Sequence, residues 1–248
     1  MSNKCAKITS ASGFLQLIYL FFAIQTKRFY FMLDYMSRRF FTFTIDKLVK
    51  KHNQFKMDFL KEAPVDRFVA MALLEKHLSN KNLIKHCIAT ETAMGFFARH
   101  LGEDETRWSL AGLLHDLDYD YTKDDFSKHG KMSGEILRKE GFDDTEILDA
   151  IVMHSGNVPA TSEMGKALYA VDPATGLVTA GVFMSPEKNI HKMSVDFLMK
   201  RFREKRFAAG ANREQIMTAA TNFDVTLEQF LEIVLNGMRS RSSEIGLG

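Results

Sequence analysis

The sequence predicts an all-α fold, a bundle of packed helices. Apolar residues recur at helical spacing along most of the 248 residues, and no segment shows a convincing run of the alternating pattern that is typical of β-strands. Hydrophobic residues make up 46% of the chain and charged residues 26%, which is ordinary for a water-soluble globular protein. Only four prolines interrupt the pattern, so long helices are expected.

The helices of the first half are marked by capping residues at their starts and by glycines at their ends. Ser79-Asn80 and Ser127 each precede a predicted helix, and Gly102 and Gly141 each follow one. In order, the predicted helices cover Glu62–Leu78, Lys81–Leu101, a segment from Asp104 or Glu105 to the pair His115-Asp116, Lys128–Glu140, and Thr145–His154 after Asp143 or Asp144.

The second half continues the helical pattern. Pro173 lies between the first two predicted helices of this half, and Asp172 before it is placed equally well to cap a helix. The predicted helices here cover Ser162–Val171, Thr175–Met184, Val195–Ala209, Arg213–Thr221 and Leu227–Met238. Together the two halves predict one helical domain over residues 57–240, followed by a tail over residues 241–248.

An uneven distribution of charge separates the first 56 residues from the rest. They carry ten Lys and Arg against two Asp, a charge of +8, whereas the remainder has 23 basic and 29 acidic residues, a charge of −6. They also contain nine of the 21 phenylalanines and no glutamate. This break predicts a domain boundary near Lys56-Met57, with a basic, Phe-rich extension (residues 1–56) before it.

Three interpretations of residues 1–56 are open. The apolar run Phe14–Ile24 covers about a dozen residues, short of the roughly 20 needed to cross a bilayer. A membrane anchor or targeting segment, an amphipathic arm on a membrane surface, and a spurious upstream translation with the true start at Met57 all fit. We favour the last, because the globular pattern begins at Met57. Membrane association is expected only if the extension is genuine.

The cysteines predict the cellular compartment, and the composition argues against some classes of function. Cys5 and Cys87 are 82 positions apart and form no CxxC motif, so reduced thiols in a cytoplasmic protein are expected. No Gly-rich phosphate loop is present. The acidic balance after residue 56 and the lack of an aromatic and basic platform argue against nucleic-acid binding, so no nucleic-acid partner is expected.

Residues suited to binding a divalent metal occur at five places along the chain. They are His86, the pair His115-Asp116, His129, His154 and Asp172. Imidazole and carboxylate hold catalytic metals while leaving positions for water and substrate. A single histidine on an apolar helix is more often a packed core residue. The pair carries more weight, because an Asp buried next to two leucines needs a compensating cation or hydrogen bonds.

The order of these residues resembles the H…HD…D pattern of the HD superfamily of metal-dependent phosphohydrolases. The resemblance covers roughly residues 57–240 and implies an HD-domain helical bundle. It also implies that one metal ion is held by His86, His115, Asp116 and Asp172. In two-metal members, two further histidines hold a second ion with the aspartate of the pair bridging, and here these are His129 and His154. No His-Asp-Ile-Gly-Lys sequence is present, which argues against the HD-GYP cyclic-dinucleotide phosphodiesterases.

The implied chemistry is hydrolysis by a water molecule that one or two divalent ions activate. Asp116 and Asp118 are the candidate catalytic residues. Asp118 is expected to transfer a proton or to support the ligands, although a solvated loop carboxylate fits its position equally well. The ligand set does not distinguish Mn, Fe, Co, Ni, Zn and Mg.

Cations for phosphate binding are expected near residues 200–206, where five Lys and Arg occur within seven residues. Such a charge run is more often a solvated helix face. Phenylalanines at 197, 202 and 207 would nevertheless anchor this helix and direct some arginines toward a site, and arginine suits bidentate phosphate binding. The candidate substrate-binding residues are Lys188, Arg201, Arg203 and Lys205.

The leading hypothesis is a phosphohydrolase that cleaves a nucleotide or another small phosphorylated metabolite. A di-iron oxygenase on the same scaffold fits the same ligands. A non-enzymatic nucleotide-sensing module that retains a metal for structure fits them as well. Asp116→Asn is expected to abolish turnover in the first two cases and only to lower stability in the third.

Overall fold

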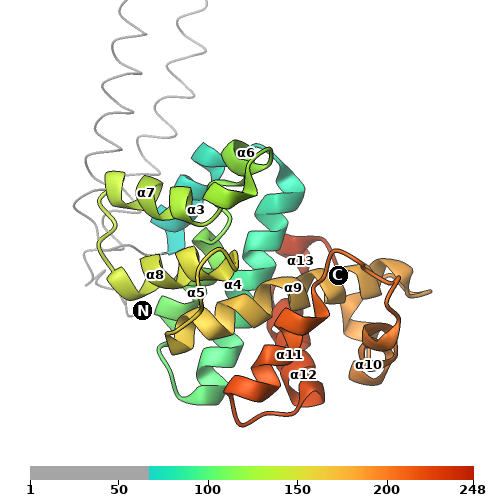
Figure 1. The fold of residues 1–248 in the computed structure, drawn as a ribbon. Helices are drawn as coiled ribbons and strands as arrows, with labels where there is room; N and C mark the ends of the chain where they lie inside the picture. The colour runs from blue at the N-terminus through green and yellow to red at the C-terminus, as the bar shows by residue number, and fades with distance from the viewer. Residues whose placement is uncertain (1–66) are drawn as a thin grey trace, which may run out of the picture. The chain divides into compact units, whose positions relative to one another are not determined.

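The computed structural model describes residues 67–248 as an assembly of helices (Figure 1). No residue in that range lies in a strand, which confirms the predicted all-α class. The α-helices are α3 (Arg67–His77), α4 (Lys81–Leu101), α5 (Glu105–Leu114), α6 (Tyr119–Thr122), α7 (Lys131–Lys139), α8 (Thr145–His154), α9 (Glu163–Met184), α10 (Val195–Arg203), α11 (Arg213–Asn222), α12 (Leu227–Ser240) and α13 (Ser242–Ile245). Two 3-10 helices, η1 (Phe126–Lys128) and η2 (Ile190–Lys192), complete the set.

The chain divides into two units, residues 1–59 and 60–248. The predicted extension, its boundary at Lys56-Met57 and the three interpretations of it lie outside the described residues. Cys87 is buried and free, and burial raises the pKa of its thiol well above the usual value. Among the described helices, α9 has the length and composition to cross a membrane, but 56% of that stretch is buried inside the protein, as is typical of a core helix.

Helix α4 is enclosed by its neighbours. It contacts α5, α9, α12 and α13. A Cβ on Gly112 of α5 would lie 2.6 Å from the Thr90 carbonyl oxygen, and a Cβ on Gly237 of α12 would lie 2.7 Å from that of Thr92. Neither glycine has room for a side chain, so both helices approach the backbone of α4 closely. These contacts fix the position of His86, which lies about one turn before Thr90.

Capping side chains set several helix starts where the sequence predicts them. Asn80 begins α4, Asp104 begins α5 and Asp144 begins α8, and each accepts a hydrogen bond from a backbone N–H in the first turn. Gly102 ends α4 in the left-handed conformation, with φ +79°. The predicted bounds of α4 and α8 are confirmed, because local capping decides them.

Helix α7 begins later than predicted. The prediction of a helix over Lys128–Glu140 capped by Ser127 is wrong, because residues 126–128 form η1 and α7 starts at Lys131. The Ser127 hydroxyl instead donates to Asp125, the residue that caps η1. Gly130, with φ +79°, turns the chain between the two helices. His129 therefore lies in a turn and not within a helix.

The prediction of two helices around Pro173 is also wrong, since α9 runs unbroken from Glu163 to Met184. Proline lacks a backbone N–H and costs about 3 kcal/mol in a helix interior. The helix persists because α4, α8, α11 and α12 all pack against it, and Pro173 is itself buried. Asp172 consequently lies within a core helix and does not cap one.

Two further differences fall near the C-terminus. Helix α10 ends at Arg203, six residues before the predicted end at Ala209. Residues 241–248, expected as a tail, contain α13 and bury Ile245 and Leu247. The Ile190 N–H donates to the Leu247 carbonyl at 2.8 Å, so this segment is part of the packed domain.

Candidate metal centre

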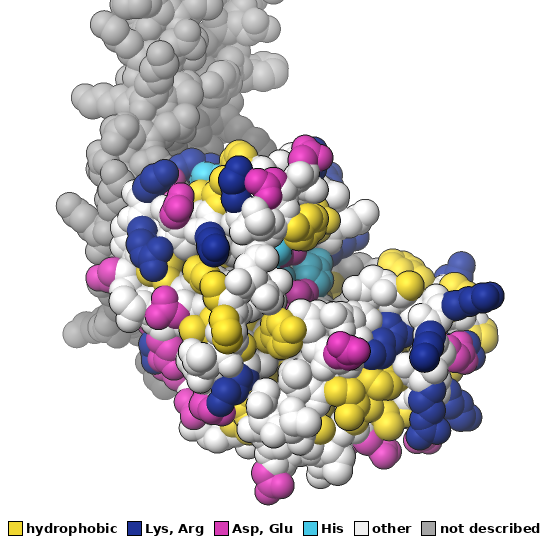
Figure 2. Space-filling model, in the orientation of Figure 1, with side chains coloured by type: hydrophobic (Ala, Val, Ile, Leu, Met, Phe, Trp, Pro, Cys, Tyr) yellow, Lys and Arg dark blue, Asp and Glu magenta, His cyan; other side chains and the backbone are white. Residues whose placement is uncertain are grey.

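Six side chains from five segments converge in the structure. They are His86 of α4, His115 and Asp116 at the end of α5, His129 before α7, His154 at the end of α8, and Asp172 of α9. Histidine and acidic side chains are visible together in a recess near the centre of Figure 2. Because the segments are far apart in the sequence, this arrangement depends on how the helices pack.

One cluster contains His86, His115 and Asp172. The Nε2 atom of His86 lies 2.9 Å from Asp172 Oδ1, and the Nε2 atom of His115 lies 3.6 Å from the same oxygen. The ligand atoms of these three residues all lie within 4.8 Å of one another. This spacing suits a single cation held by imidazole and carboxylate.

The second cluster surrounds the Asp116 carboxylate. Its Oδ1 atom lies 3.4 Å from His115 Nε2, 3.2 Å from His129 Nε2 and 3.5 Å from His154 Nε2. Its Oδ2 atom lies 3.8 Å from His86 Nε2. Asp116 therefore faces both clusters, which is the position of a carboxylate suited to bridging two ions.

The rings of His115 and His154 are oriented so that Nε2 points into the centre. His115 Nδ1 donates to the Gly112 carbonyl at 2.8 Å, and His154 Nδ1 donates to the Ile151 carbonyl. Within residues 67–248, the buried Nε2 atom of His115 has no hydrogen-bond partner. Metal-binding histidines commonly use their second nitrogen in this way, which leaves the first as a ligand.

His129 and His154 give a second indication that a cation fits. Their Nε2 atoms face each other at 3.1 Å. His129 Nδ1 donates to Asp118 Oδ1 at 2.8 Å, while His154 Nδ1 is used by the backbone. In neutral rings both Nε2 atoms then present lone pairs to each other, which is unfavourable unless a proton or a metal ion lies between them.

The electrostatics of the centre favour positive charge. Burial opposes protonation of His129, but hydrogen bonds and charge from Asp116 and Asp118 outweigh it and raise its pKa to about 10. Burial likewise opposes protonation of His115, yet Asp116 and Asp172 raise its pKa to about 9. The same histidines overcome burial and hold the pKa values of Asp116 and Asp172 well below their usual range. A divalent cation competes with protons held in this way.

Asp118 lies behind His129, away from solvent. Its side chain is fully buried, and its Oδ2 atom accepts from the Ser133 N–H at 3.0 Å. The Ser133 hydroxyl in turn donates to the His115 carbonyl at 3.1 Å. The sequence suggested proton transfer or ligand support for Asp118, and this placement favours support, because the carboxylate orients His129.

Gly130 allows the turn that carries His129 to lie against the end of α8. A Cβ at this position would lie 2.9 Å from the Ile151 carbonyl oxygen and 3.1 Å from that of Val152. The Ile151 carbonyl also accepts the hydrogen bond from His154. The glycine thus brings the two histidines together.

Thr175 is a supporting residue that sequence reasoning missed. Its hydroxyl lies 3.3 Å from His86 Nδ1 and donates to the Asp172 carbonyl at 2.8 Å. Thr175 lies three residues after Asp172. The sequence points to Thr175 as a neighbour of Asp172 only if α9 is known to continue through Pro173. Ser133 carried no signal in the sequence.

The four predicted substrate-binding cations are not among the converging side chains. The Arg201 guanidinium lies 2.7 Å from the Glu204 carboxylate and over the rings of Phe197 and Phe207. The other three, Lys188, Arg203 and Lys205, are exposed. In Figure 2, basic side chains gather at the right of the view, apart from the recess.

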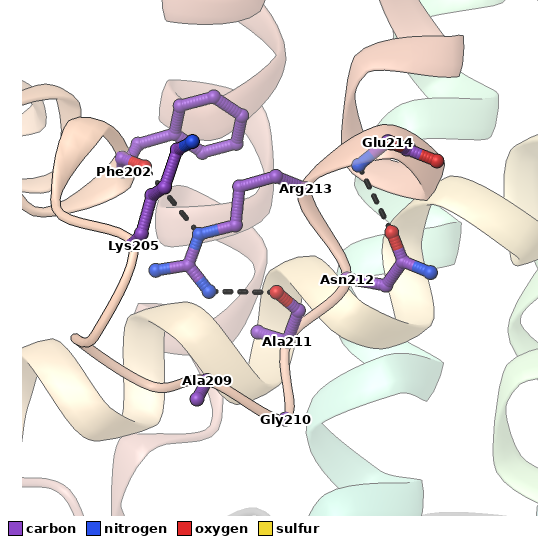
Figure 3. A pocket seen from close by; sticks show the side chains of 8 residues that line it. All are labelled: Phe202, Lys205, Ala209, Gly210, Ala211, Asn212, Arg213 and Glu214. Atoms are coloured by element: carbon purple, nitrogen blue, oxygen red, sulfur yellow. Dashed lines mark hydrogen bonds between the residues drawn. The ribbon is translucent and has the colours of Figure 1, made fainter.

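A pocket lies between α10 and the start of α11 (Figure 3), lined by Phe202, Lys205, Ala209, Gly210, Ala211, Asn212, Arg213 and Glu214. Sequence reasoning did not select Arg213. Its guanidinium donates to four backbone carbonyls, those of Phe202, Phe207, Ala208 and Ala211. Arg213 therefore holds this segment in place and has few donors left for an anion. None of the six converging side chains lines the pocket.

An all-α bundle with clustered His and Asp ligands defines a candidate metal-dependent enzyme. The HD domain family matches residues 83–220, more than half of the chain, and the chain belongs to this family. The match includes all six converging residues. Family membership agrees with the resemblance seen in the sequence and supports a metal-dependent phosphohydrolase.

Curated relatives share part of their length with this chain. Ribonuclease Y 2 of Pediococcus pentosaceus is 29% identical over 148 residues, which cover 54% of this chain and 28% of that protein. Ribonuclease Y of Oleidesulfovibrio alaskensis is 30% identical over 97 residues, 39% of this chain and 18% of that protein. Ribonuclease Y of Staphylococcus epidermidis is 29% identical over 137 residues, 54% and 26% of the two chains. No solved structure gives a significant match.

These relatives correct one expectation from the sequence. The chain matches only 18% to 28% of their length, and their names describe enzymes that act on RNA. The expectation of no nucleic-acid partner is therefore wrong. The expectation relied on the overall charge of residues 57–248 and on the lack of an aromatic and basic platform in the sequence. Neither property reports a local site that packing assembles.

Proposed function

We propose that this protein is a metal-dependent phosphohydrolase that cleaves a phosphate bond in a nucleotide-containing substrate, with RNA included in that class. The convergence of six His and Asp side chains from five segments supports this proposal most strongly. The sequence favours a nucleotide or small phosphorylated metabolite, and the ribonuclease relatives extend the substrate class to RNA.

We assign one divalent ion to His86, His115, Asp116 and Asp172, and a second to Asp116, His129 and His154. A divalent ion in such a site neutralises phosphate oxygens and lowers the pKa of a bound water toward neutrality. The remaining contributions come from the chain itself. Asp118 keeps the Nδ1 atom of His129 protonated, so its Nε2 lone pair faces the centre.

The exposed cations have a supporting role in this proposal. Lys188, Arg203 and Lys205 project into solvent and attract a phosphorylated substrate by charge. Arg201 contributes less, because Glu204 already neutralises its guanidinium. Truncating Arg203 and Lys205 together is therefore expected to raise KM more at low salt than at high salt, since salt screens exposed charges.

The test is an assay of metal-stripped protein to which Mn²⁺, Fe²⁺, Co²⁺ or Mg²⁺ is restored. The substrate panel contains mononucleotides, dinucleoside polyphosphates, simple phosphoesters and a short single-stranded RNA. Metal-dependent release of product from a nucleotide or RNA is expected. No metal-dependent turnover on any of these phosphates rejects the proposal. Oxygen uptake with iron that Mn²⁺ does not replace would instead favour an oxygenase.

A matched pair of variants connects the activity to the centre. Asp116→Asn removes the charge that faces four histidines and is expected to lower turnover at least a hundredfold. Asp149→Asn makes the same change at an exposed position on α8 and is expected to keep wild-type activity. An active Asp116→Asn protein would show that the reaction takes place elsewhere.

A further inference from the structure

Phe126 holds an aromatic ring in solvent beside the candidate metal centre. The residue is 53% exposed, and its ring centroid lies 5.3 Å from that of His129. Tyr119 completes a group of three rings, 5.9 Å from Phe126 and 6.0 Å from His129. His129 Nε2 lies 3.2 Å from Asp116 Oδ1, so this aromatic group adjoins the centre directly.

The backbone of Phe126 is held in place by hydrogen bonds. Asn157 Nδ2 donates to the Phe126 carbonyl at 2.7 Å and to the His129 carbonyl at 3.4 Å. The His129 N–H also donates to the Phe126 carbonyl, at 3.2 Å. Asp125 caps η1, the short helix that begins with Phe126. The exposed ring thus belongs to the same hydrogen-bonded turn as the candidate metal ligand His129.

A single exposed apolar side chain is common on protein surfaces and needs no explanation by itself. Phe126 differs because of where its ring is fixed. Phe183 of α9 is equally exposed, at 59%, but lies about 16 Å along the helix from Asp172. Hydrophobic side chains border the recess that contains histidine and acidic side chains in Figure 2. An apolar surface next to a phosphate-cleaving centre suits a substrate with a flat apolar part.

We propose that Phe126, with Tyr119 packed against it, is a stacking surface for the nucleobase of the substrate. This inference rests on the proposed function, because it assumes that the phosphate lies at the metal centre. Only the ribose separates base from phosphate in a nucleotide, so a base on Phe126 leaves its phosphate within reach of the histidines. Every base has a π face, so stacking tolerates different sequences. This subsite therefore selects nucleotides over phosphates that lack a base.

The test compares two ligands that differ only in the base, using the full-length protein with Mg²⁺. The first ligand is 2-aminopurine ribonucleoside 5′-monophosphate, whose fluorescence falls when its base stacks. The second is ribose 5-phosphate, whose binding is measured by calorimetric titration. The wild type is expected to quench the fluorescence and to bind the nucleotide more tightly. In Phe126→Ala, the affinity for the nucleotide relative to that for ribose 5-phosphate is expected to fall by roughly five- to a hundredfold. This is the usual effect of losing one stacked base. Phe126→Tyr is expected to restore the relative affinity.

Phe183→Ala is the matched control, since it removes an exposed phenylalanine far from the centre and is expected to leave the relative affinity unchanged. Equal weakening of both ligands by Phe126→Ala would overturn the proposal, because the ring would then act only by supporting His129. No quenching in the wild type would overturn it as well. Quenching without turnover on any phosphate would reject the proposed function and leave the base subsite standing. Turnover without quenching would reject the base subsite and leave the proposed function standing.

Discussion

Each histidine of the candidate metal centre directs one ring nitrogen toward the centre and places the other beside a hydrogen-bonding group. His115 and His154 use backbone carbonyls, His86 lies beside the Thr175 hydroxyl, and His129 uses the Asp118 carboxylate. A carboxylate partner raises the basicity of the ring more than a carbonyl does, because it carries a full charge. His129 is therefore the candidate ligand whose basicity depends most on one neighbouring side chain.

Asp118→Asn is expected to weaken metal binding at the site that includes His129 by about 10- to 100-fold. The amide keeps the shape of the carboxylate but loses its charge, so His129 becomes a poorer ligand. Titration calorimetry of metal-stripped protein with Zn²⁺ measures this directly. Asp124→Asn, an exposed change in the same loop, is the control and should bind like the wild type. Equal Zn²⁺ affinities in the wild type, Asp118→Asn and Asp124→Asn would contradict the role of Asp118 in supporting His129.

Helices bring these residues together through close backbone contacts. Gly112 takes part in two contacts. It lies close to the Thr90 carbonyl of α4, and its own carbonyl accepts a hydrogen bond from His115. The contact between α4 and α5 therefore also sets the distance between His86 and His115, whose ring centroids lie 5.1 Å apart.

Gly112→Ala is expected to lower the free energy of unfolding by about 1–3 kcal/mol, the usual cost of overpacking a tight interior. Its Cβ would lie 2.6 Å from backbone, so α4 and α5 must separate. Urea unfolding measures the loss, and metal affinity should fall with it. Gly176→Ala on α9 has no atom within 4 Å of the added Cβ, so this control is expected to be neutral or to gain up to about 1 kcal/mol. A stable Gly112→Ala protein would show that these helices tolerate separation.

Asp144 joins α5 to the helix that carries His154. It caps α8, and its carboxylate accepts two hydrogen bonds from Arg107, both at 2.9 Å. Arg107 is the main cause that holds the pKa of this carboxyl below its usual value of 3.8. Because the folded-state pKa is depressed, the stabilisation is fully present above about pH 4 and is lost as the pH falls through the folded-state pKa.

Asp144→Asn is expected to lower the free energy of unfolding by about 0.5–1 kcal/mol at pH 7, because the amide still caps α8 but does not pair with Arg107. The difference from the wild type should shrink as the pH falls below about 4. Urea unfolding at a series of pH values measures it. A difference that stays constant from pH 7 to pH 3 would show that the ion pair adds nothing.

The whole domain is expected to gain stability from its metal. The ligands come from five segments, so unfolding separates them and metal binds the folded state preferentially. At a metal concentration of about 100 times Kd, the gain is about 2.7 kcal/mol, or roughly 5–10 °C in Tm for a domain of this size. Thermal scans with and without a chelator measure this shift. Asp116→Asn should lose most of it, and an equal shift in that variant would place the metal elsewhere.

Much of the centre was predictable because its order along the chain is a sequence property. The H…HD…D pattern selected four of the six converging residues, the two further histidines of two-metal members gave His129 and His154, and capping residues gave the bounds of α4 and α8. The pattern did not identify Thr175 or Ser133, because each supports a candidate ligand that is distant from it in the sequence. It did not identify Phe126 either, because the place of its ring beside His129 depends on the short helix η1, which the sequence did not predict. Arg201 was selected for its charge, yet Glu204 and two phenylalanine rings already engage it.

Spacing and residue type are local properties, and they were enough to predict the helical class, the capped helix starts and the set of side chains able to hold a metal. Helix α9 continues through Pro173 because its burial against the surrounding helices outweighs the lost hydrogen bond, and tertiary packing alone supplies that burial. Tertiary packing also decided that Asp118 faces His129 and not solvent, and that an aromatic ring stands at the edge of the centre. Those outcomes depend on contacts between distant segments, which no local pattern encodes.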